Sequence, residues 1–164
     1  MYKRQIENLT LIGSREVNGN GNELNNVLTG NDGANVMNAG AGDDTLTGGK
    51  GHDALIGGAG HDHFVFSSLN ATDSDTIRDF VVGEDDIRLD NAVFTQLGPD
   101  GALSVNAFWA SATGAAHDAD DRILYNTTTG QLFYDADGNG AGAAVLIAAL
   151  AHNPAISAAD FLVI

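Results

Sequence analysis

The clearest pattern in the sequence is an apolar side chain that recurs at every ninth residue across residues 21–66. An aspartate or asparagine stands two residues before each apolar residue. Divided into units of nine from Gly21, the chain reads GNELNNVLT, GNDGANVMN, AGAGDDTLT, GGKGHDALI and GGAGHDHFV. The apolar eighth positions are Leu28, Met37, Leu46, Leu55 and Phe64, and the polar sixth positions are Asn26, Asn35, Asp44, Asp53 and Asp62. A flexible glycine-rich linker has no reason to keep this period, so the pattern predicts a folded repeat.

Each unit predicts a short strand of three residues centred on the apolar eighth position, whose side chain points inward while its neighbours point outward. The other six residues must reverse the chain, and glycine adopts the positive φ angles that such a tight reversal needs. Two units then complete one coil, so turns on the same side lie 18 residues apart. Asp44 stacks on Asp62 in this arrangement, and Asn35 stacks on Asp53. The predicted fold is all-β, a parallel β-roll.

The stacked carboxylates predict a metal site. Like charges one strand spacing apart, ~4.8 Å, repel unless a cation lies between them. Carbonyl and carboxylate oxygens are the ligands that Ca²⁺ prefers, so calcium is the predicted cofactor. The candidate ligands are Asp44, Asp53, Asp62, Asn35, Asp43, Gly40, Gly42, Gly49, Gly51, Gly58 and Gly60. Sites should be strongest around the three sixth-position aspartates, and the earlier, asparagine-bearing coils could be held by asparagine ladders and packing alone.

Charge and composition support a cation as the partner. The chain has 22 acidic residues against 7 Lys and Arg, a net charge of −15, and 18 of the acids are aspartate, the short carboxylate suited to turns and hard cations. This balance argues against nucleic acid or an anionic membrane, both of which select basic patches. The chain contains no cysteine, hence no disulfide or thiolate site. No apolar stretch is long enough for a signal peptide or a membrane span.

After residue 66 the nine-residue period stops and a β-rich cap is predicted over residues 69–164. Its expected elements are two short strands joined by a turn within residues 73–90, a possible short helix around Phe108 and Trp109, and a three-stranded meander within residues 121–150. Ser157 and Asp160 have capping-box spacing ahead of a short apolar strand. Asp75 and Asp79 are candidates for completing a calcium site where the roll meets the cap. Residues 1–20 are expected to form an irregular first coil, and residues 21–66 the roll itself.

The repeat resembles the RTX (repeats-in-toxin) nonapeptide G-G-x-G-x-D-x-U-x, a calcium-binding β-roll repeat. The resemblance covers residues 21–66, and within Ala39–Val65 only Ala39 departs from it. The segments DTIRDFVVGEDDI, DRILYNTTTGQLFYDADGNG and ADFLVI are similar to the C-terminal domain of serralysin-type exoproteins. That resemblance implies an uncleaved C-terminal signal read by an ABC-type type I exporter, secretion from a bacterial cell, and an upstream catalytic or adhesive domain.

Other interpretations of the sequence are weaker. DADGNG (residues 135–140) begins like an EF-hand loop, but position 12 is Leu146, so a hairpin turn is preferred. His52, His61 and His63 are interpreted as surface spacers rather than as a zinc site. No familiar catalytic motif is present, so a non-catalytic module is expected. The alternative function is a structural or carbohydrate-binding accessory module, such as an adhesin tail.

Overall fold

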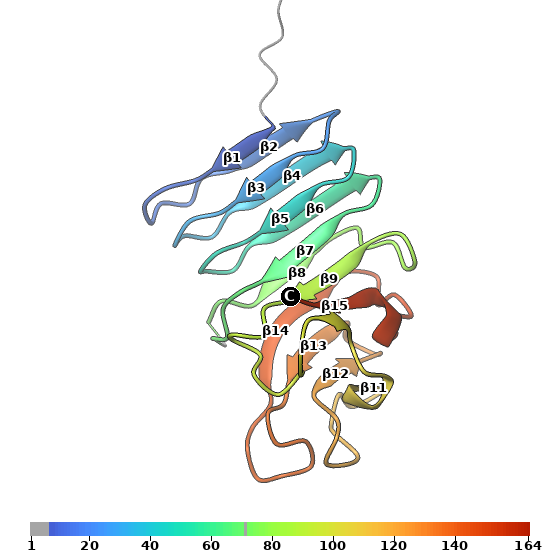
Figure 1. Ribbon diagram of the computed structural model, residues 1–164. Helices are drawn as coiled ribbons and strands as arrows, with labels where there is room; N and C mark the ends of the chain where they lie inside the picture. Colours follow the sequence, from blue (N-terminus) through green and yellow to red (C-terminus); the bar gives the residue numbers. More distant parts are fainter. Residues whose placement is uncertain (1–6, 71) are drawn as a thin grey trace, which may run out of the picture.

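The computed structural model describes residues 7–70 and 72–164, and Figure 1 shows their strands stacked in successive coils. Residues 1–6 of the predicted first coil therefore lie outside the described residues. Two sheets face each other, and each coil gives one strand to each sheet. The first sheet contains β1 (Asn8–Thr10), β3 (Val27–Thr29), β5 (Thr45–Thr47), β7 (His63–Phe66) and β9 (Asp86–Leu89); the second contains β2 (Gly19–Asn22), β4 (Val36–Ala41), β6 (Ala54–Ala59) and β8 (Asp75–Ile77).

The register of these strands confirms the predicted roll. All of these pairs are parallel, and within the repeats partners lie 18 residues apart, as in Leu46 with Phe64 and Gly40 with Gly58. The offset grows to 22 where β8 joins β6 and to 23 where β9 joins β7. Short insertions therefore interrupt the sequence period while both sheets continue past the predicted roll boundary at residue 66.

The core of the roll is the inner row of apolar side chains that the eighth position predicts. These five side chains are at most 1% exposed, and the row continues into the next coil with two fully buried isoleucines; its members are Leu28, Met37, Leu46, Leu55, Phe64, Ile77 and Ile87. Burial of a side chain of this size contributes about 1.5–3 kcal/mol. The row therefore positions the turns on either side of it.

The cap extends the same two sheets. Its strands are β10 (Gly101–Ala102), β11 (Phe108–Ser111), β12 (Ile123–Asn126), β13 (Gln131–Tyr134), β14 (Val145–Leu150) and β15 (Phe161–Val163). The meander β12–β13–β14 is confirmed, and β14 joins β8 in parallel. β15 lies between β9 and β10, so a strand from the end of the chain joins the roll to the edge strand β10 in the first sheet (Figure 1).

One predicted element of the cap is wrong. The residues around Phe108 and Trp109 form strand β11, preceded only by the short 3₁₀ helix η1 (Val105–Ala107). Parallel pairing with β12 and the strand preference of aromatic residues override the local helical signal. The capping box is confirmed at η2 (Ala158–Asp160), where Ser157 and Asp160 bond reciprocally. Among the described residues, no helix has the length and apolar character needed to cross a membrane.

Candidate metal centre

The predicted ligands gather at the two long edges of the roll, where the chain passes from one sheet to the other. We call the edge that contains Asp44 and Asp62 the Asp44 edge, and the edge that contains Asn35 and Asp53 the Asp53 edge. Stacking within each edge follows the 18-residue register. The prediction that Asp44 stacks on Asp62 and Asn35 on Asp53 is confirmed by hydrogen bonds between adjacent coils.

Each edge carries a ladder in which a backbone amide donates to the sixth-position side chain of the next coil. On the Asp44 edge, the amide of Asn26 donates to Asp44 Oδ1 at 2.6 Å, that of Asp44 to Asp62 at 3.0 Å, and that of Asp62 to Asp85 at 3.0 Å. On the Asp53 edge, the amide of Asn35 donates to Asp53 Oδ1 at 2.7 Å. The amide of Asp53 donates to Asp75 Oδ1 at 3.0 Å. One oxygen of each of these carboxylates is thus fixed by the fold.

The second oxygen is the notable feature. Oδ2 of Asp44, Asp53 and Asp62 is buried and finds no hydrogen-bond partner within the described part of the chain. The Oδ2 atoms of Asp53 and Asp75 both point toward Gly48. A Cβ built on Gly48 would lie 2.5 Å from each of them. A buried, unpaired carboxylate oxygen is strongly unfavourable. These residues therefore fit a hard cation, whose charge would satisfy the oxygens left over by the ladder.

The electrostatics agree with this geometry. Burial, together with the neighbouring carboxylates of Asp85 and Asp44, raises the pKa of Asp62 to about 7. Burial, and to a smaller extent repulsion from Asp53, raises the pKa of Asp75 to about 8. The pKa of Asp44 is also raised, first by burial. Because both burial and crowding penalise the anions, the ladder is poised to take up either protons or a cation.

The six predicted glycines shape the turns. All six have positive φ, and they occupy the second and fourth positions of the last three units: Gly40, Gly42, Gly49, Gly51, Gly58 and Gly60. Adjacent coils approach so closely there that a Cβ on Gly58 would collide with the carbonyl oxygen of Gly40. The turns can therefore bring backbone carbonyls toward the carboxylates of the adjoining coil.

Three predicted ligands lie away from the ladder or apart from each other. Asp43 is exposed and its Oδ1 accepts the amide of His61 at 3.0 Å. Asp75 and Asp79 do not share a site. Asp79 accepts the amides of Gly57 and Gly58, at 3.0 and 2.9 Å, on the Asp44 edge, whereas Asp75 belongs to the Asp53 edge. Asp75 begins strand β8 and Asp79 follows its end, so the two lie on opposite edges of the roll and would serve different ions.

Sequence reasoning missed two acidic residues at the junction of roll and cap. Asp85 ends the ladder on the Asp44 edge, and Asp73 Oδ1 accepts the amide of Gly51 at 3.3 Å. Because insertions lengthen these coils to 22 and 23 residues, an 18-residue repeat does not predict their positions. A signal was present for Asp85, because it stands two residues before the buried Ile87, the same spacing that joins Asp62 to Phe64.

A second group of ligand-type side chains lies in the cap, at His117, Asp118 and Asp121. The buried Asp121 already accepts the amides of His117 and Asp118, at 2.6 and 3.1 Å, and contacts His117 Nδ1 at 2.8 Å. This group is therefore a hydrogen-bonded turn.

The segment that follows β13, DADGNG, begins the connection to the antiparallel β14, which confirms the preference for a hairpin turn there.

Comparison with known proteins supports calcium as the cation that the ladder fits. The sequence model of the RTX calcium-binding nonapeptide repeat matches residues 20–55 and, one unit further on, residues 29–64. Residues 20–64 therefore carry RTX calcium-binding repeats, and calcium is the ion that such repeats bind. Bound calcium would supply positive charge between the stacked carboxylates, in a structural module built from repeated turns.

The fold is also found in a solved structure. The AlgE6R3 subunit of the Azotobacter vinelandii mannuronan C5-epimerase has a similar structure, with 24% sequence identity and a TM-score of 0.59. The alignment covers 98% of this chain and 85% of the AlgE6R3 chain. At that identity the similarity establishes the shared β-roll architecture. No curated protein sequence matches the chain.

Proposed function

We propose that this chain is a non-catalytic module that folds when it binds calcium outside the cell. The observation that carries the proposal is the set of buried, unpartnered Oδ2 atoms of Asp44, Asp53 and Asp62. Without a cation these anions oppose folding, so in a cytosol poor in calcium the repeats remain unfolded and can be threaded through an exporter. Extracellular calcium modules have dissociation constants of about 10⁻⁴–10⁻³ M, and there the binding free energy becomes folding free energy.

The test is a calcium titration of the chelated chain followed by far-UV circular dichroism, with magnesium as the matched control. A cooperative gain of β signal with calcium alone is the expected result, because magnesium demands a smaller and more regular site. A chelated chain that is already folded and does not respond to calcium would overturn the proposal.

We further propose that residues 156–164 are the signal for an ABC-type type I exporter, and that the module belongs to a secreted bacterial protein with a catalytic or adhesive domain upstream. The resemblance of the cap to serralysin-type domains supports this assignment. In the folded state the same segment has a second role, because Phe161 and Val163 are buried in β15 between β9 and β10. Signal and fold must therefore be separated experimentally.

A reporter fused upstream of the chain, in a cell that carries a type I exporter, makes this separation. Deletion of residues 156–164 should abolish export. Ile87→Ala is the matched control, since Ile87 is buried beside Phe161 in the same sheet but lies outside the segment. It weakens the fold and should leave export intact. Undiminished export of the deletion variant would refute the signal assignment.

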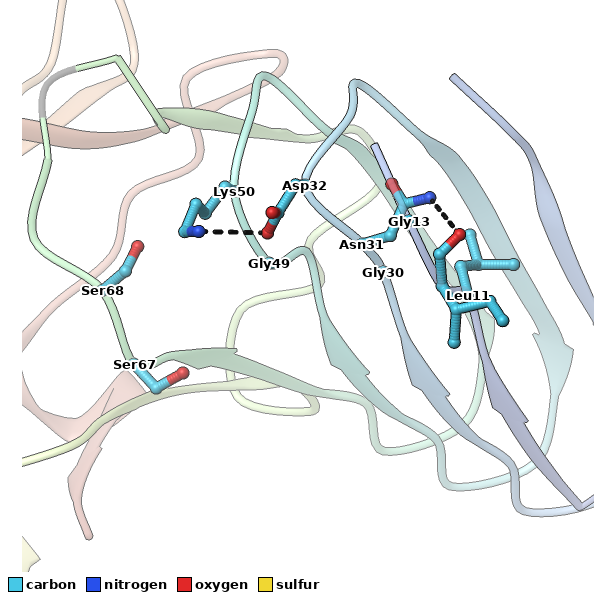
Figure 2. A pocket seen from close by; sticks show the side chains of 10 residues that line it. Leu11, Gly13, Gly30, Asn31, Asp32, Gly49, Lys50, Ser67 and Ser68 are labelled. Carbon is cyan, nitrogen blue, oxygen red and sulfur yellow. Dashed lines mark hydrogen bonds and ion pairs between the residues drawn. The ribbon is translucent and has the colours of Figure 1, made fainter. Parts of the chain in front are cut away.

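A second candidate function is an accessory module that binds a polysaccharide. It is favoured by an open groove of about 480 Å³ along the Asp53 edge, lined by residues such as Leu11, Asn31, Lys50 and Ser67 (Figure 2). The AlgE6R3 subunit, which shares the fold, belongs to an enzyme that acts on mannuronan. Isothermal titration of the calcium-loaded chain with mannuronan oligomers tests this candidate, and absence of any heat of binding counts against it for that polymer.

A further inference from the structure

The turn 30–35 differs from the later turns at its second position, Asn31. The later units have glycines with positive φ there, whereas Asn31 is not among the described residues with positive φ. Its side chain is turned inward and is 7% exposed. A side chain at this position is therefore accommodated in the second coil, although at the equivalent Gly49 a Cβ would lie 2.5 Å from the carbonyl oxygen of Asn31.

The carboxamide of Asn31 bonds in two directions. Its Oδ1 accepts the amide of Gly33 at 2.8 Å and the side-chain amide of Asn35 at 3.1 Å, both within its own turn. Its Nδ2 donates across to the preceding coil, to the carbonyl oxygens of Ile12 at 3.3 Å and Arg15 at 3.1 Å. In Figure 2 the dashed line from the side chain of Asn31 marks its bond to the carbonyl oxygen of Ile12. One side chain thus joins the segment 11–18 to the turn 30–35.

The sixth position of this turn also differs from the later ones. Asn35 Oδ1 accepts the backbone amide of Asn31 at 3.0 Å, so its oxygen is satisfied within the turn. One coil further on, Asp53 Oδ2 is buried without such a partner. The turn 30–35 therefore offers a neutral, paired amide where the turn 48–53 offers a carboxylate with one unpaired oxygen.

An amide NH₂ group carries partial positive charge, and here it faces two carbonyl oxygens from the adjoining coil. A calcium ion between two turns would receive oxygens of the same kind. We propose that the side-chain amide of Asn31 takes the place of a cation at the junction of segment 11–18 with turn 30–35. This junction closes without calcium, and ion binding on the Asp53 edge begins one coil later. The inference builds on the proposed function by defining where its calcium array begins.

Asn31→Asp is the decisive variant. A carboxylate at this position would face the carbonyl oxygens of Ile12 and Arg15 and would need a cation between them. Equilibrium dialysis of the full chain at saturating calcium should therefore find one more bound ion than in the parent chain. Asn38→Asp is the matched control, because Asn38 is exposed on β4, and it should leave the number of ions unchanged. Asn31→Ala should also leave that number unchanged while lowering the thermal midpoint in calcium.

An Asn31→Asp chain that folds in calcium with the parental number of ions would overturn the inference. If that variant stays unfolded, the pair Asn31→Gly with Asn35→Asp decides, since it rebuilds the glycine and aspartate of the later units and should take up one additional ion. A parent chain that takes up no calcium would refute the proposed function instead. Even in that case, the inference about Asn31 requires that the Asn31→Asp chain bind one more ion than the Asn38→Asp chain.

Discussion

Asp53 shows at the scale of one residue why the ladder needs a cation. Its Oδ1 is held by the amide of Asn35, its Oδ2 is buried without a partner, and Asp75 lies beside it. Asp53→Asn removes one of two facing anions and one proposed calcium ligand. Calcium affinity should fall at least about tenfold, while the chelated chain should gain β signal because repulsion is relieved. Calcium titrations followed by circular dichroism measure both effects.

The control for Asp53→Asn is Asp120→Asn, an exposed aspartate in the cap. It changes the net charge equally and should leave the calcium midpoint in place. Equal shifts in both variants would mean that total charge, rather than the ladder, sets the affinity.

Comparing Gly58 with Gly83 separates two requirements for glycine in the turns: a positive φ angle and the close approach of the neighbouring coil. Gly58 and Gly83 both have positive φ, at 106° and 78°. A Cβ on Gly83 meets nothing within 4 Å, whereas one on Gly58 collides with the carbonyl oxygen of Gly40. In saturating calcium, Gly83→Ala should cost about 1–2 kcal/mol, the usual cost of left-handed backbone for an L-residue, and Gly58→Ala clearly more. Urea unfolding measures the difference, and equal losses would contradict the close approach of the two turns.

At the scale of the element, the sequence was sufficient where the period of nine is unbroken. Leu46 and Phe64 pair as predicted because each unit repeats the same strand and turn. Beyond residue 66 the insertions shift the register, so neither the continuation of both sheets through β8 and β9 nor the role of Asp85 followed from counting. Trp109 entered a strand because its partner, Leu124 in β12, is supplied by a segment distant in sequence.

The strand β15 is where the end of the chain stabilises the cap. Phe161 is buried, pairs with Ile87 and packs against Phe108 with ring centroids 5.5 Å apart. Phe161→Ala should destabilise the calcium-loaded chain by about 3–5 kcal/mol. Leu162→Ala is the control on the same strand, since Leu162 is only partly buried, and should cost less. Denaturant unfolding in calcium compares them, and similar losses would show that β15 does not anchor the cap.

At the scale of the whole molecule, the net charge of −15 and the buried ladder make protons and calcium alternative counter-charges. The pKa of Asp62 is raised to about 7 and that of Asp75 to about 8, above the value near 3.9 of an unfolded aspartate. The folded chain therefore binds these protons more tightly than the unfolded chain. Their stabilisation is complete below about pH 4 and is lost as the pH rises through about 7 to 8.

Acid should accordingly replace part of the calcium requirement. In chelator, the β signal of the chain should increase as the pH is lowered from about 8 to about 5, because folding retains the protons on Asp62 and Asp75. With calcium the trend should reverse, since protonation removes the anions that we propose as ligands of the ion. The double variant Asp62→Asn with Asp75→Asn has no carboxyl to titrate at either position and should flatten the chelated profile. Circular dichroism across this pH range, with and without calcium, gives the comparison. A chelated parent chain that gains structure toward alkaline pH would show that the ladder carboxylates do not govern its folding.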